Sequence, residues 1–186
     1  YDPARFGNFD KILYKNPVVG STYEPGSTFK TLVMGASIDK KVITAMTTMD
    51  ETGPVGVGEY TIRTWNNEYH GTITMTDVLT HSSNVGMVFV GKKLGKGALL
   101  SYIRSYGFGD TTGIDLEDEA SPELRPDRDW GEIDLATASF GQGIAVTPLQ
   151  MVRAVAAIAN GGMLMEPKVV KSIIDEHGKR TDLAPK

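Results

Sequence analysis

The segment 147–162, TPLQMVRAVAAIANGG, carries the strongest local signal in the chain. Thr147 can cap a helix, Pro148 suits its first position, and Gln150 completes a capping box. The Asn-Gly-Gly run at 160–162 is typical of a helix that ends in residues with a left-handed backbone conformation. Because only Gln150 and Arg153 are strongly polar between positions 149 and 159, we expect this helix to be buried on most sides. The fold therefore has to cover it.

Helical patterns also dominate the rest of the chain. A stripe at i, i+3, i+4 and i+7 predicts a helix over about 27–41 and consists of Phe29, Leu32, Val33 and Ala36. Further helices are expected over 74–80, 84–95 and 97–106, the first of them opened by a weak capping box. Pro, Gly and Asn punctuate 1–22, 50–72 and 117–130, which indicates loops, with one strand piece in the second. We predict a mainly α structure.

Composition excludes several classes of protein. The 186 residues fit one domain, and the formal net charge of −4 argues against nucleic acid as a partner. There are no cysteines, so disulfide scaffolds and thiolate metal sites are excluded. No apolar run approaches the roughly 20 residues that span a bilayer. The chain opens on YDPARFGNFD without Met or a visible signal peptide, so we expect an excised piece of a longer protein.

One hydroxyl and one amine are spaced for acyl transfer. In YEPGSTFK, residues 23–30, Ser27 precedes Lys30 by three positions at the start of an expected helix. At about 100° per residue the two side chains lie about 60° apart, and the apolar stripe is centred about 140° away. Burial can lower the pKa of a lysine until its neutral amine accepts a hydroxyl proton. The alternative is an ordinary helix cap beside a solvated lysine.

A second polar group favours the chemical interpretation. THSSNVG, residues 80–86, puts Ser82, Ser83 and Asn84 between two expected helices. Such residues usually cap and solvate a loop, but Ser and Asn also suit a proton relay and an amide contact. Together YEPGSTFK, SSNVG and FGQGIAVTPLQMVRAVAAIANGG, in this order, closely resemble the transpeptidase domain of class B penicillin-binding proteins, most of all the division-type group. The resemblance runs from YDP at the start to EPKVV at 166–170.

The resemblance implies a fold and four site residues. The chain would be the helical part of the α/β penicillin-binding serine transpeptidase, or β-lactamase-like, fold. Ser27 matches the nucleophile and Lys30 the general base of acylation. Ser82 matches the hydroxyl that shuttles a proton, and Asn84 the amide that contacts the lysine and the substrate backbone.

Other residues are weaker candidates. By the same resemblance Gln142 lies near the rim of the active site, where it is either a ligand contact or part of a plain turn. Trp65 lies in a loop whose family counterpart approaches the active-site cleft, so it either reaches the cleft or packs in the core. Ser83 is expected to be a bystander. The three histidines are not spaced like metal ligands, so we assign no metal, and no cofactor is implied. They are His70, His81 and His177.

The sequence departs from the family in two respects, the first being that the strands that normally precede YDP are missing. The family's third motif, Lys-Thr/Ser-Gly on a strand, binds the substrate carboxylate and supplies the second oxyanion N–H, and no such triplet occurs here. GKRT at 178–181 has the wrong order and no strand-like run around it. We therefore expect residues 1–186 to be a partial transpeptidase domain, truncated at both ends, and inactive or nearly so in isolation.

Three functions stay open at this stage. The first is a peptidoglycan D,D-transpeptidase that cross-links stem peptides through a serine acyl-enzyme and is the target of β-lactam antibiotics. The second is a non-catalytic β-lactam-binding or interaction module of the same fold, and the third a serine β-lactamase. For the first, the resemblance implies cell-division membrane proteins as partners and a place on the extracytoplasmic face of the bacterial membrane.

Overall fold

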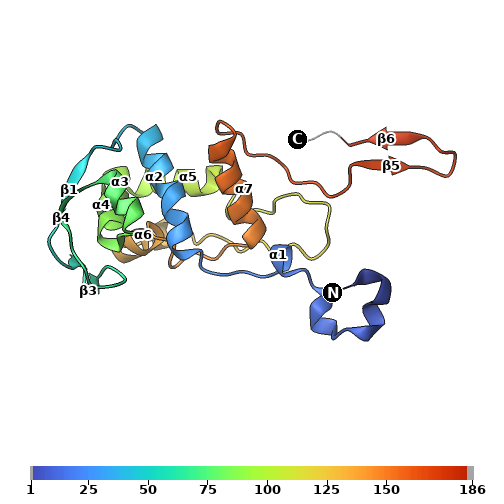
Figure 1. Ribbon diagram of the computed structural model, residues 1–186, viewed down its shortest axis with the longest axis horizontal. Coiled ribbons are helices and arrows are strands. Elements are labelled where there is room, and N and C mark those ends of the chain that lie inside the picture. The colour runs from blue at the N-terminus through green and yellow to red at the C-terminus, as the bar shows by residue number, and fades with distance from the viewer. Residues whose placement is uncertain (1, 184–186) are drawn as a thin grey trace.

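Helix α2 (Lys30–Asp39) lies at the centre of the fold in the computed structural model, which describes residues 2–183. It packs against α4 (Asn84–Leu94), α5 (Lys96–Ser105) and α7 (Pro148–Ala159) (Figure 1). The predicted stripe is confirmed, because all four of its residues are buried in the core, namely Phe29, Leu32, Val33 and Ala36. The α-helix begins three residues later than predicted, after the 3-10 turn η3 (Gly26–Phe29) that carries Ser27.

Two shorter helices complete the helical body. Helix α3 (Met75–Thr80) opens with the predicted capping box, in which the Thr74 hydroxyl accepts from the backbone N–H of Asp77 and the Asp77 carboxylate accepts from that of Thr74. Helix α6 (Glu132–Ala138) packs on α4 and is not among the sequence predictions. Its seven residues bury only two alanines, so the apolar periodicity that reveals longer helices is weak here.

Within residues 2–183 the strands form three separate antiparallel pairs instead of one continuous sheet. They pair as β1 (Thr48–Glu51) with β4 (Gly71–Thr74), β2 (Val55–Val57) with β3 (Tyr60–Ile62), and β5 (Ser172–Ile174) with β6 (Arg180–Asp182). The β1–β4 pair packs on α3 and α4. Strands β2 and β3 lie in the loop that connects β1 to β4. The single strand piece predicted in 50–72 therefore underestimates the strand content.

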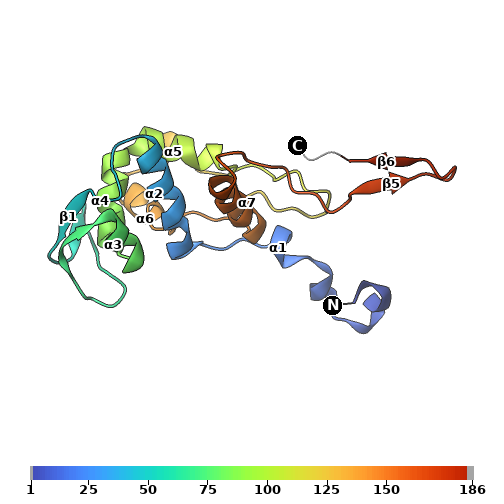
Figure 2. The ribbon, with the colours of Figure 1, turned by 45° about the horizontal axis from the view of Figure 1, so that its top comes forward.

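Two segments extend away from the helical body in both views (Figures 1 and 2). The N-terminal segment contains η1 (Pro3–Asn8), η2 (Lys11–Tyr14) and α1 (Pro17–Gly20), so the loop predicted for 1–22 is wrong in part. Asp2, Asp10 and Asn16 side chains cap these short turns. The second segment is the β5–β6 hairpin. The expectation of no strand around GKRT is wrong, because Arg180–Asp182 pairs with Ser172–Ile174 although its residues are exposed.

The environment of α7 also differs from the prediction. Thr147 and Gln150 form the predicted capping box, and Pro148 occupies the first turn. The helix is not buried on most sides, since Val152 is 65% exposed and Val155 and Ile158 are exposed beside it. Gln150 is instead only 1% exposed, with its Nε2 donating to the Asp110 carbonyl.

The charged segment 117–130 is mostly exposed loop, as predicted, but it is anchored at its end. It contains the short 3-10 helix η4 (Asp127–Asp129) and finishes at Trp130, which is buried. The Trp130 indole donates to the Arg125 carbonyl, and the Arg125 guanidinium lies over its ring. Among residues 2–183, no helix has both the length and the apolar character needed to cross a membrane.

Candidate active site

Ser27 is presented at the surface by a tightly fixed turn. Pro25 and Gly26 precede it, and Gly26 has a φ of 55°, in the left-handed region that favours glycine. The Gly26 N–H donates to the Gly141 carbonyl at 2.9 Å, which ties the turn to the segment before α7. Ser27 itself is exposed in the first turn of η3, where backbone N–H groups have no partner inside the helix.

Lys30 lies one turn further on and is buried, with 2% of its surface exposed. Its Nζ donates to the Ser82 carbonyl at 2.6 Å, to Ser82 Oγ at 3.0 Å and to Asn84 Oδ1 at 2.9 Å. Ser82 Oγ in turn lies 3.0 Å from Ser27 Oγ. The described hydrogen bonds therefore connect Ser27 to Lys30 through Ser82.

The surroundings of Lys30 raise the fraction of its amine that is neutral. Burial removes water from the ammonium and lowers the pKa of Lys30 from 10.5 to about 8. The three oxygens that accept from Nζ belong to a carbonyl, a hydroxyl and an amide, so all of them are neutral. Because no carboxylate is among these contacts, nothing in them offsets the effect of burial on the pKa.

The second polar group has an unusual backbone. Ser82 has a φ of 53°, a left-handed conformation that is uncommon for residues with a Cβ. This conformation directs both its carbonyl and its hydroxyl toward Lys30 Nζ. Asn84, at the start of α4, is fixed from the other side because its Nδ2 donates to the Arg63 carbonyl at 3.1 Å.

A pocket of about 520 Å³ opens beside Ser27 and Ser82. Trp65 lines it and is 73% exposed, so the alternative that this tryptophan packs in the core is wrong. Gln142 is exposed in the turn between α6 and α7. Its neighbours reach the turn that carries Ser27, since the Gly141 carbonyl accepts from Gly26 and the Gly143 N–H donates to Glu24 at 2.9 Å.

The structure adds residues that sequence reasoning missed. His70 and His81 also line the pocket, and their rings stack with centroids 4.1 Å apart. Ser83, expected to be a bystander, caps α4 and hydrogen-bonds to the buried carboxylate of Glu51. A serine directly before a predicted helix was a usable signal for the cap. No pattern in the nearby sequence indicates that Glu51 or His70 contacts this region. His177 lies on the exposed β5–β6 turn, and no metal-binding cluster of three acidic or His side chains occurs within residues 2–183.

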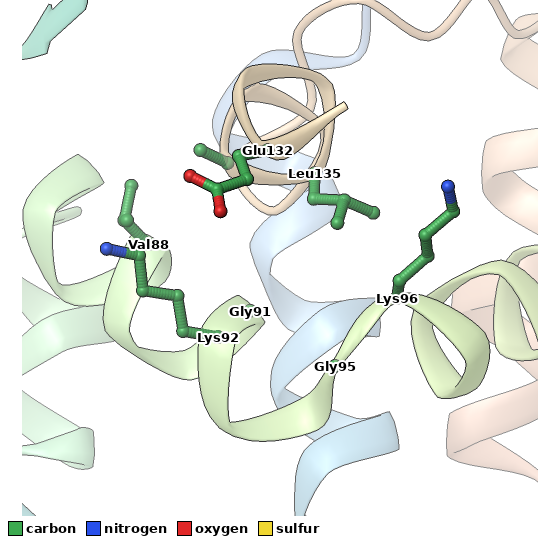
Figure 3. Close-up of a pocket in the computed structure, with 8 residues that line it drawn as sticks. Val88, Gly91, Lys92, Gly95, Lys96, Glu132 and Leu135 are labelled. Atoms are coloured by element: carbon green, nitrogen blue, oxygen red, sulfur yellow. The ribbon is translucent and has the colours of Figure 1, made fainter. Parts of the chain in front are cut away.

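A second pocket, of about 320 Å³, lies between α4, α5 and α6. Figure 3 shows Glu132 and Leu135 of α6 facing Lys92 and Lys96 of the other two helices. Lys96 Nζ donates to the Trp130 carbonyl at 2.6 Å, so it is engaged in holding the loop before α6. The residues that line this pocket include no hydroxyl, so the candidate site for acyl transfer is the pocket at Ser27.

A surface serine joined through a second serine to a buried lysine, with an amide on the same amine, is the arrangement of a serine acyltransferase that uses lysine as its base. The family model for the penicillin-binding protein transpeptidase domain matches residues 1–186, and the chain belongs to this family.

Individual relatives agree with this assignment. Stage V sporulation protein D of Bacillus subtilis (strain 168) is 41% identical over 183 residues, which cover 97% of this chain and 28% of that protein. The peptidoglycan D,D-transpeptidase FtsI of Escherichia coli (strain K12) is 29% identical, covering 92% and 29%. The chain thus spans less than a third of the length of these relatives.

Solved structures give the same result for the fold. Penicillin-binding protein 3 of Mycobacterium tuberculosis, complexed with aztreonam, superposes with a TM-score of 0.87 at 30% identity, covering 99% of this chain and 40% of that one. A peptidoglycan synthetase from Bifidobacterium adolescentis gives 0.86 at 30% identity, covering 92% and 31%. The folded part described above is therefore similar to the corresponding part of penicillin-binding proteins.

Proposed function

We propose that this chain is the nucleophile-bearing part of a longer peptidoglycan D,D-transpeptidase, with Ser27, Lys30, Ser82 and Asn84 as its catalytic group. The observation that carries the proposal is the buried Lys30 amine, bound to Ser82 and Asn84, with Ser82 in contact with Ser27. The names of the relatives, which include peptidoglycan D,D-transpeptidases, support the same reaction class.

Acylation begins with proton transfer out of Ser27. Rotation of the two hydroxyl groups lets Ser27 donate to Ser82 and Ser82 donate to neutral Lys30 Nζ. Ser27 Oγ then attacks the carbonyl carbon between the two terminal D-alanines of a stem peptide. Backbone N–H groups in the first turn of η3 are suited to stabilise the resulting oxyanion. The C–N bond breaks, and the proton on Lys30 returns through Ser82 to the departing D-alanine nitrogen.

Deacylation completes the cross-link. The amine of a neighbouring stem peptide attacks the Ser27 ester, forms the new amide bond and gives up a proton, while Ser27 Oγ leaves and is reprotonated. A β-lactam reacts in the first step only, because opening of its ring keeps the leaving nitrogen attached and the acyl-enzyme persists. Exposed Trp65 and Gln142 are proposed to contact the substrate at the edges of the site.

Labelling with a fluorescent penicillin tests the proposal. The full-length protein should form a stable one-to-one adduct that Ser27→Ala abolishes. Thr28→Ala is the matched control, since it removes the adjacent hydroxyl, which donates to the Pro25 carbonyl, and should still be labelled. Labelling that survives Ser27→Ala would contradict the proposal, and rapid penicillin hydrolysis would favour a β-lactamase instead.

Two further expectations concern the whole protein. The isolated 186 residues should be acylated more slowly than the full-length protein, by about 10²–10³-fold for a missing oxyanion donor, and equal labelling rates would contradict this. We also propose that the whole protein acts on the outer face of the bacterial membrane together with cell-division membrane proteins, and the names of the relatives support this. Co-purification of such partners with the full-length protein would test it.

A further inference from the structure

Glu51 is a fully buried carboxylate that the proposed reaction does not use. It is 0% exposed at the end of β1, where it pairs with Gly71 of β4. A buried carboxylate is costly unless hydrogen bonds satisfy it. One oxygen of Glu51 accepts from Ser83 Oγ, and the other accepts from the His70 backbone N–H at 3.2 Å and lies 3.0 Å from His70 Nδ1.

The contact with Ser83 directly reaches the turn that carries Ser82 and Asn84. Ser83 stands between Ser82 and Asn84, the two residues that hold Lys30 Nζ. Its hydroxyl donates to Glu51 and accepts from the Gly86 N–H at 2.8 Å, so it is fixed from both sides. Since Ser82 keeps a left-handed backbone that is disfavoured by itself, the turn needs such external restraint.

The contact with His70 also reaches the lining of the pocket. The His70 ring stacks on His81, with an interplanar angle of 12°, and both rings line the pocket beside Ser27. His81 directly precedes Ser82 in the chain. Glu51 therefore fixes the same turn at two points, once through Ser83 and once through the stacked histidines.

We propose that Glu51 is a positioning residue for acylation: it acts through Ser83 and His70 to hold the Ser82 hydroxyl between Ser27 and Lys30. This inference rests on the proposed function. Displacement of a reacting group by about 1 Å can cost roughly 100-fold in rate. The Ser27–Ser82 and Ser82–Lys30 distances, both 3.0 Å, leave little room for movement of the turn before the relay is broken.

Glu51→Gln is the direct test. The amide keeps the size of the side chain but replaces one acceptor oxygen with a donor, which must face either Ser83 or the N–H of His70. Acylation of the full-length protein by a fluorescent penicillin is followed at several concentrations, which separates the initial complex from the limiting acylation rate. We expect the limiting rate to fall about 10- to 100-fold, with less than about a threefold change in the dissociation constant of the initial complex.

Glu119→Gln is the matched control. That carboxylate also accepts from a backbone N–H and a hydroxyl, both of Thr112, at 2.7 and 2.5 Å, but it does not line the pocket at Ser27. It should lower thermal stability without changing the acylation rate. Ser83→Ala removes one of the two links that Glu51 makes, so it should lower the limiting rate by no more than Glu51→Gln does, and the double variant should be no slower than Glu51→Gln alone.

The outcomes separate the two proposals. An unlabelled wild-type protein overturns the proposed function and, with it, this inference. A labelled wild type with an unchanged limiting rate in Glu51→Gln overturns this inference alone, and so does strict additivity in the double variant. Should Glu51→Gln fail to fold, Ser83→Ala carries the test, since a wild-type limiting rate in that variant also overturns the inference.

Discussion

Replacing Asn84 with Asp tests whether a lowered lysine pKa drives the chemistry. With a pKa of about 8, Lys30 is neutral in about one molecule in ten at pH 7. An unperturbed lysine would be neutral in about one in 3,000, so burial raises the population of competent base about 300-fold. This population depends on Lys30 having neutral partners, one of which is Asn84 Oδ1 at 2.9 Å.

Asn84→Asp places a carboxylate at that contact with almost no change in size. An opposite charge at such a distance favours the ammonium and raises the pKa by about 1–3 units. The sign is therefore upward, from about 8 to roughly 9–11. At pH 7 the neutral fraction, and with it the acylation rate, should fall by about 10- to 1,000-fold. The loss should shrink as the pH rises through the new pKa.

The assay is the second-order rate of acylation by a fluorescent penicillin, measured from pH 6 to pH 10 in the full-length protein. The wild-type rate should increase with pH and level off above about 8. The Asn84→Asp rate should still be rising at the upper end. Asn84→Ala is the control, because it removes the same contacts without adding charge and should lower the rate about equally at every pH. An Asp variant that keeps the inflection near 8 would refute the reasoning.

Three structural predictions concern backbone and caps. Gly141→Ala should reduce acylation and lower the melting temperature, because Gly141 has a φ of 81° and a Cβ there would overlap the backbone of Gly26 next to the nucleophile. Gly86→Ala should destabilise by about 1–3 kcal/mol, since its Cβ would meet the Val78 side chain at less than 3.0 Å, and chemical unfolding measures this. Thr147→Ala should cost about 1 kcal/mol of unfolding free energy through the lost cap of α7, with little effect on acylation.

Gly97→Ala gives the matched control for the two glycine variants. Position 97 is helical and a Cβ there has nothing within 4 Å, so alanine should raise stability by about 0.5–1 kcal/mol. A destabilised Gly97→Ala, or a neutral Gly86→Ala, would contradict the steric argument. For the cap, a loss of acylation as large as that in Gly141→Ala would show that Thr147 does more than start α7.

The parts of the fold that depend on neighbouring residues were predictable from the sequence. The apolar stripe of α2, the capping boxes at Thr74 and Thr147, and helices α4 and α5 follow from spacings of three and four residues, and the structure confirms them. The order of the motifs gave the family, which the match over residues 1–186 confirms. The short elements α6 and the β5–β6 hairpin were not predicted, because they bury too little apolar surface to produce a periodic pattern in the sequence.

The supporting contacts of the candidate site were not predictable in this way. Spacing alone suggested that Lys30 could accept a proton from Ser27, but the side chains that contact its amine, Ser82 and Asn84, lie more than fifty positions away. Glu51 meets Ser83 and His70 only because β1 pairs with β4 in a particular register. A register is set by tertiary packing, and a single sequence contains no direct record of it.

Helix α7 shows why apolar character predicts burial but not its direction. Its sequence is apolar almost all round, which favours a helix covered on most sides. In the structure the capping box turns Gln150 inward to the Asp110 carbonyl, so the polar residue is buried and Val152 faces solvent. A buried amide with its hydrogen bonds satisfied costs little, whereas the same amide without a partner would cost more than exposing a valine. The hydrogen bonds of Gln150 therefore explain how a polar side chain can share the buried face of α7 with Met151, Ala154 and Ala157.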